Sequence, residues 1–86
     1  MTLAEFHEYR NGVMSHRPEW TRFDYCQAWI SDSYFGVKLV KSYSTIVGVI
    51  KDDTLWWDQK YSRTTSKQIT RIANRYNLNT AQVEDV

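Results

Sequence analysis

The spacing of hydrophobic positions changes late in the chain. Between Gly36 and Tyr61 apolar residues alternate with polar ones or form short runs, which is typical of β-strands. From Thr65 onward they recur at every third or fourth position, which is typical of an amphipathic helix. Residues 36–76 therefore hold strands, turns and a helix, and we expect the rest of the chain to pack on this segment.

The clearest predicted helix covers residues 65–77. Thr65 and Gln68, three residues apart, are typical of a capping box at a helix start. The apolar residues that follow lie at positions i, i+3, i+4 and i+7, namely Ile69, Ile72, Ala73 and Tyr76. We expect this stripe to pack on one face of a sheet through Ile69, Ile72 and Tyr76, and residues 78–86 to form a loose tail or one last turn.

Three strands are predicted at residues 34–43, 45–51 and 55–61, joined by tight turns into an antiparallel meander. Residues 20–30 have an ambiguous period, but their aromatic and β-branched content favours a fourth strand, so that the sheet spans residues 20–61. Gly48 lacks a side chain in the middle strand, and Trp56 or Trp57 is the expected filler of that space.

A short helix is predicted at the start of the chain. Thr2 and Glu5 form a second capping-box pattern, and the helix is expected to end at Asn11 and Gly12, within a unit of residues 1–12. Residues 13–19 then form a connector. The expected fold is a single small α+β domain: an antiparallel sheet of three or four strands with an N-terminal helix and a C-terminal amphipathic helix packed on it.

Size and cysteine content restrict the class of protein. A domain of 86 residues buries only about 60–65% of its unfolded surface, which makes a deep catalytic cavity hard to build. The single cysteine, Cys26, cannot form an internal disulfide, and no charged-then-apolar leader opens the chain. No apolar run is long enough to span a bilayer. We therefore expect a cytoplasmic protein that does not bind membranes.

Basic charge is concentrated in the second half of the chain. The net charge is +1, but residues 37–76 carry eight Lys and Arg against three Asp. Lys67, Arg71 and Arg75 are spaced by four residues and so form one ridge on the predicted helix, which Arg63 and Lys60 can extend. This ridge is expected to contact nucleic-acid phosphates or an acidic protein surface. The alternative is a solvated helix face balanced by carboxylates of the same chain, and the sequence favours neither.

Candidate chemistry is otherwise sparse. Trp56 and Trp57 are neighbours on a strand and must point to opposite faces, so one of them is either covered by a helix or left as a binding site. The remaining metal-binding residue types have spacings that match no zinc pattern; they are His7, His16, Asp24 and Cys26. No serine or cysteine nucleophile arrangement stands out. We expect no enzyme, no metal site and no cofactor.

Two short motifs resemble a known group of proteins. Residues 42–47, SYSTIV, and residues 61–67, YSRTTSK, are similar to the pattern SYxTxV, hairpin, YSxTTS(K/R) and helix of small, mostly uncharacterised proteins of phages and other mobile elements. The likeness covers roughly residues 36–75. Many members have His where Gln68 stands, so a role attached to that histidine does not carry over to this chain.

The resemblance implies a viral accessory protein that acts in the host cytoplasm by binding. We therefore expect a non-enzymatic protein that binds a host protein or nucleoprotein complex, most concretely an inhibitor of a nucleic-acid-directed defence system such as a CRISPR effector. The alternative is a small nucleic-acid-binding regulator that uses the basic helix face. A homodimer formed through an exposed sheet edge at residues 55–61 is a further hypothesis.

Overall fold

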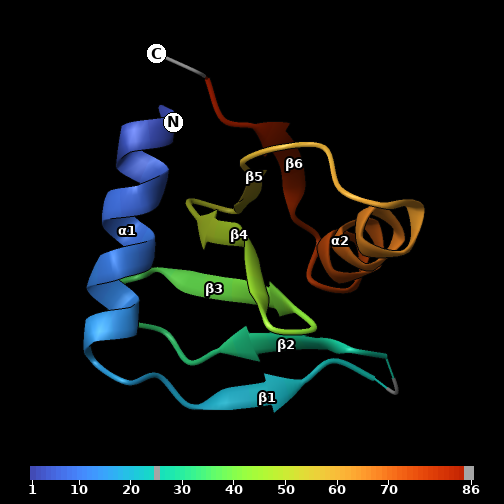
Figure 1. Ribbon diagram of the computed structural model, residues 1–86, viewed down its shortest axis with the longest axis horizontal. Coiled ribbons are helices and arrows are strands. Elements are labelled where there is room, and N and C mark those ends of the chain that lie inside the picture. Colours follow the sequence, from blue (N-terminus) through green and yellow to red (C-terminus); the bar gives the residue numbers. More distant parts are fainter. Residues whose placement is uncertain (25, 85–86) are drawn as a thin grey trace.

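The computed structural model describes residues 1–24 and 26–84 and shows an α+β domain with two helices and one six-stranded sheet (Figure 1). The helices are α1 (Leu3–Ser15) and α2 (Arg63–Arg75). The strands are β1 (Trp20–Arg22), β2 (Ala28–Ser31), β3 (Lys38–Ser42), β4 (Thr45–Lys51), β5 (Thr54–Trp57) and β6 (Asn79–Gln82). The predicted fold class is confirmed, although the sheet has more strands than expected.

The strands lie in the sheet in the order of the chain. Neighbours from β1 to β5 are antiparallel, and the predicted meander of β3, β4 and β5 is confirmed. Residues 20–30 were predicted as one strand but contribute two, because the chain turns back between Arg22 and Ala28. The predicted loose tail at residues 78–86 is wrong for its first part, since β6 pairs in parallel with β5; residues 85–86 lie outside the described residues.

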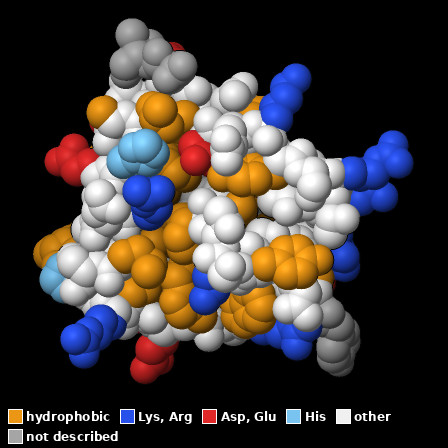
Figure 2. Space-filling model, viewed as in Figure 1, with side chains coloured by type: hydrophobic (Ala, Val, Ile, Leu, Met, Phe, Trp, Pro, Cys, Tyr) orange, Lys and Arg blue, Asp and Glu red, His pale blue; other side chains and the backbone are white. Residues whose placement is uncertain are grey.

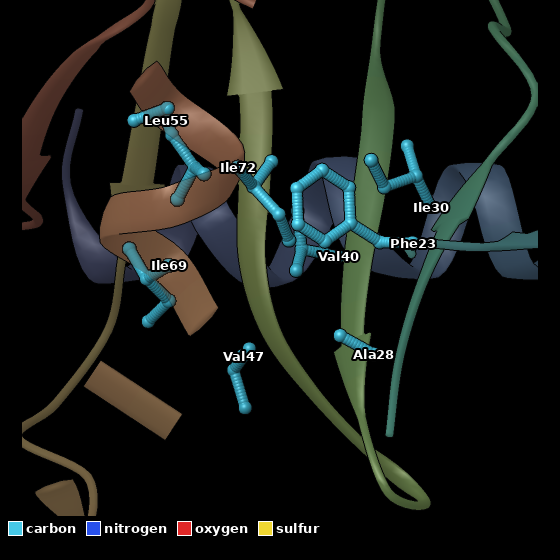
Figure 3. Close-up of a cluster of buried hydrophobic side chains, with 9 residues drawn as sticks. Phe23, Ala28, Ile30, Val40, Val47, Leu55, Ile69 and Ile72 are labelled. Atoms are coloured by element: carbon cyan, nitrogen blue, oxygen red, sulfur yellow. The ribbon is translucent and has the colours of Figure 1, made fainter. Parts of the chain in front are cut away.

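One face of the sheet packs against α2. Figure 3 shows Ile69 and Ile72 of α2 over the strands, with the Phe23 ring between α2 and the β2–β3 part of the sheet. Tyr76 was predicted to complete this apolar stripe, but it is the C-cap residue of α2 and is 53% exposed. A buried Thr65 and Gln68 extend the inner face of the helix instead.

The other face of the sheet packs against α1. Phe6 is fully buried there with Leu39 and Val49, and Val13 and Val83 complete the cluster. The helix begins at the predicted capping box, in which Thr2 and Glu5 exchange hydrogen bonds. It continues past the predicted end at Gly12 to Ser15 and ends just before Pro18, which cannot continue a helix.

Gly48 allows β4 to approach its neighbour closely. A Cβ atom at this position would lie 2.9 Å from Leu55 Cδ2 and 3.3 Å from the backbone oxygen of Trp56. The prediction that Trp56 or Trp57 fills this space is therefore wrong. The side chain of Leu55 fills it instead. The fully buried Leu55 thus depends on the absence of a side chain at Gly48.

The strand β6 covers the sheet edge that the sequence suggested as a dimer interface. β5 pairs with β4 on one side and with β6 on the other, from Thr54↔Asn79 to Trp57↔Gln82. Two further backbone bonds join the region after β6 to the start of α1: Glu84 N–H donates to Met1 O at 2.9 Å and Leu3 N–H donates to Glu84 O at 2.8 Å. The predicted exposed edge is therefore already paired over Thr54–Trp57, and β5 has no free edge there for a second copy.

Candidate functional site

The outer face of α2 carries a row of four basic side chains. Arg63, Lys67, Arg71 and Arg75 follow one another at intervals of four residues, all are exposed, and we call them the α2 basic face. The helix contains no acidic residue. Its N-terminus lies two residues before the predicted start, since Ser62, not Thr65, is the N-cap and accepts a hydrogen bond from Thr65 N–H. The earlier start adds Arg63 to the helix.

A carboxylate far away in the sequence partly neutralises the C-terminal half of this face. Asp24, which follows β1, accepts two hydrogen bonds from Arg75 Nη2 at 3.1 and 3.0 Å. Arg71 Nη2 lies 3.5 Å from the same carboxylate. The Arg75 guanidinium also lies over the Phe23 ring, 5.1 Å from its centroid. Asp24 therefore positions these two arginines, and no local pattern in the sequence predicts this pairing.

The N-terminal half of the face keeps its charge. Within residues 1–24 and 26–84, neither Arg63 nor Lys67 forms an ion pair. Four cations against one carboxylate leave an excess of three positive charges along about 18 Å of helix. The hypothesis that carboxylates of the same chain balance the ridge thus holds for part of it only.

A shallow groove of about 200 Å³ adjoins the α2 basic face. Trp57, Lys60 and Tyr61 line it on one side and Ser66 and Thr70 of α2 on the other. The Tyr61 hydroxyl donates a hydrogen bond to Asp58, and burial, together with this bond, raises the pKa of Tyr61 to about 12. Tyr61 is therefore neutral at physiological pH, and the exposed Lys60 supplies the positive charge at this end.

The two tryptophans predicted for the site are separated by the sheet. Trp57 packs against the cluster under α2, whereas Trp56 packs against the cluster under α1. Both are half-buried, so neither is a freely exposed aromatic ring. Of the seven predicted binding residues, the structure brings Lys60, Trp57 and the α2 basic face together and places Trp56 on the opposite face.

The two sequence motifs meet in a buried hydrogen-bonded cluster. Ser42 Oγ lies 2.6 Å from Gln68 Oε1 and 3.1 Å from Thr65 Oγ1. A serine hydroxyl has one proton, so Ser42 donates to Gln68 and accepts from Thr65. Ser62 in turn donates to Thr65 Oγ1 at 3.4 Å. The motif residues therefore fix α2 on the β3–β4 hairpin.

Replacement of Gln68 by Leu should remove about 1–3 kcal/mol from the free energy of unfolding, because the buried Ser42 hydroxyl loses its acceptor. Urea denaturation of wild type, Q68L, S42A and the double variant measures this. The double variant should lose less than the sum of the single losses. Gln82→Leu, at an exposed position, is the control, and additive losses in the cycle would contradict the role of the cluster.

The described part of the chain was also compared with the requirements of a metal site and of a membrane-spanning helix. In residues 1–24 and 26–84, no three His, Cys, Asp or Glu side chains come together as a group that could hold a metal ion. Neither α1 nor α2 has the length and apolar character that crossing a bilayer would require.

Comparison with known proteins gives a family but no characterised relative. The pattern of a family of unknown function, DUF8033, matches residues 9–85 of this chain. That span includes all six strands, α2 and the whole α2 basic face. No curated protein and no solved structure matches the chain. Because the match covers most of its length, the chain belongs to the DUF8033 family.

Proposed function

We propose that this protein is a non-enzymatic binding protein that docks the α2 basic face on the phosphates of a host nucleic acid or nucleoprotein complex. The observation that supports this most is the excess of three positive charges that remains after Asp24 has paired with Arg71 and Arg75. Like charges four residues apart repel one another on an isolated helix, and an anionic partner relieves that repulsion.

The geometry of the face suits a contact with phosphates. Arginine and lysine side chains on one exposed helix supply point contacts to backbone oxygens without reading sequence. Ser66 and Thr70 lie between the basic side chains and add hydroxyl groups close to the same surface. Binding should therefore be insensitive to sequence and strongly dependent on salt concentration.

The resemblance of the two motifs to phage proteins supports a more specific setting for this activity. In that setting the protein is an accessory factor in the host cytoplasm that inhibits a nucleic-acid-directed defence system, such as a CRISPR effector. A defence complex holds nucleic acid in a positively charged channel, and a basic helix face would compete there for phosphates. A regulator that binds cellular nucleic acid directly uses the same surface and is the second candidate.

The test is a fluorescence anisotropy titration with labelled duplex DNA at about 50 and 200 mM salt. The informative variant carries Arg63→Gln and Lys67→Gln, because these cations have no ion pair in the described part of the chain and their loss leaves the Asp24 contacts intact. Each lost phosphate contact should lower the slope of log affinity against log salt by about one.

The matched control carries Arg10→Gln and Arg17→Gln, which change the net charge equally at α1 and just after it. It should bind as the wild type does. Equal weakening by both pairs would show an effect of overall charge and would reject the α2 basic face as the contact surface. A pull-down from host lysate with the same variants tests the inhibitor hypothesis: a captured defence complex should be lost with the α2 pair and retained with the control pair.

A further inference from the structure

A second group of basic and aromatic side chains lies on the α1 side of the sheet, away from α2. It contains Arg22 and Trp20 of β1, Trp29 of β2 and Lys41 of β3. Arg22 stands directly opposite Trp29, which stands directly opposite Lys41, so the three side chains point to the same side. We call these four residues the cation–aromatic ladder.

Each cation in the ladder lies over an indole ring. Lys41 Nζ is 4.3 Å from the Trp20 ring centroid and 5.5 Å from that of Trp29. Arg22 Cζ is 5.8 Å from the Trp29 centroid. These distances fall within the range of about 6 Å for cation–π attraction. Arg22 is also held in place from behind, since its Nε donates to Cys26 O at 2.8 Å. The rings and the cations are therefore already close together on one face of the sheet.

The ladder is partly open to solvent: Arg22 is exposed, whereas Trp20, Trp29 and Lys41 are half-buried. α1 packs on β3 and β4 and leaves the β1–β2 end of this face uncovered. Figure 2 shows hydrophobic and basic side chains next to one another over the lower strands, where β1, β2 and β3 lie in Figure 1. Among residues 1–24 and 26–84, no carboxylate forms an ion pair with Arg22 or Lys41. The two positive charges are available to an anionic partner.

The chemistry of the ladder discriminates among anionic partners. Alternating rings and cations match a polymer that alternates flat bases with phosphates, because a base can stack on an indole once Lys41 or Arg22 moves from the ring face to the adjacent phosphate. In a duplex the bases are stacked inside and cannot reach these rings. An acidic peptide would satisfy the cations but has no flat heterocycles to place on the tryptophans. An unpaired nucleic-acid strand is thus the partner that uses all four side chains.

We propose that the cation–aromatic ladder binds single-stranded DNA, with bases stacked on Trp29 and Trp20 and phosphates contacted by Lys41 and Arg22. The four side chains carry hydrogen-bond donors but no acceptor, so a ribose 2′-OH, which is both donor and acceptor, would find no partner here for its own proton. This site is separate from the α2 basic face and does not depend on the function proposed for it.

The experiment measures binding of a labelled oligothymidylate of about 12 nucleotides, a length within the usual site sizes for single strands. Trp29→Leu should weaken binding by about 10- to 100-fold, because it removes a stacking surface but keeps an apolar side chain. Arg22→Gln, at an exposed position, should weaken binding and reduce the salt slope by about one, and it costs the fold no more than the exposed hydrogen bond from Arg22 to Cys26 O. Lys38→Gln, on the opposite face of β3, is the matched control and should bind as wild type.

Four results would overturn the proposal. The first is no saturable binding of the oligothymidylate by the wild-type protein, and the second is unchanged affinity in both R22Q and W29L. The third is loss of binding in the Arg63→Gln, Lys67→Gln protein with no loss in R22Q, which would assign the strand to the α2 basic face. The fourth is tenfold tighter binding of oligouridylate, duplex DNA or polyglutamate than of oligothymidylate by the Arg63→Gln, Lys67→Gln protein, in which the α2 basic face is weakened; each of these would assign the ladder to another partner. Thermal melts of all variants confirm that each one is folded, and R22Q keeps the test valid should W29L unfold.

Discussion

Replacement of Phe6 by Ala should lower the free energy of unfolding by about 3–5 kcal/mol, the usual cost of removing a buried phenyl ring from a core. Phe6 is fully buried and lies at the centre of the contact between α1 and the sheet, against Leu39 and Val49. A domain of 86 residues has a total stability of about 4–13 kcal/mol, so this loss is a large fraction of it.

Urea denaturation followed by circular dichroism measures the effect of F6A. Glu8→Ala is the control, because it changes an exposed side chain two residues away on the same helix and should stay within about 0.5 kcal/mol of wild type. If F6A and E8A were equally stable, α1 would not be packed on the sheet as the structure shows. That result would also weaken the argument for the cation–aromatic ladder, because the ladder lies on the part of the sheet that α1 leaves uncovered.

Replacement of Val83 by Asp should cost at least about 3 kcal/mol and detach the end of the chain. Val83 is 7% exposed and packs in the same cluster as Phe6, and its backbone N–H donates to Trp57 O at 3.0 Å. A carboxylate at this position would either be buried without a partner or would pull the segment after β6 away from the sheet. Loss of that segment would expose the Trp56 side of β5.

Gln82→Asp is the matched control for V83D, because it introduces the same charge at the adjacent exposed position. Denaturation midpoints and hydrogen exchange of the β5 amides distinguish the two variants. Val83→Asp should lower the midpoint and increase exchange in β5, whereas Gln82→Asp should change neither by much. Equal midpoints for the two variants would support the loose tail that the sequence suggested for residues 78–86, in place of a paired strand.

The local sequence pattern was sufficient to predict those helices and strands whose signals lie within a few neighbouring residues. The Thr2–Glu5 capping box, the apolar spacing of Ile69 and Ile72, and the meander of β3 to β5 were all predicted from short segments. Helix and strand periods are visible in sequence because one face of each element is buried. The α+β class follows from these elements, and so does the basic row on α2, because charges four residues apart share a helix face.

Several features that the sequence missed depend on partners far away in the chain. β6 has little β-propensity of its own, with the sequence NTAQ, and it becomes a strand because β5 offers it an unpaired edge. Asp24 meets Arg75 across 51 positions, and Ser42 meets Gln68 across 26. Trp20, Trp29 and Lys41 look unrelated until the strand register places them together.

Both helices, the β3–β5 meander and the place where positive charge accumulates are visible in the sequence, since each follows from residues close together in the chain. The tertiary structure alone decided which of those charges remain available and which aromatic rings accompany them. The physical reason is that ion pairing and strand register join residues that no local period connects. For this protein the α2 basic face was therefore predictable in outline, whereas its partial neutralisation by Asp24 and the cation–aromatic ladder were not.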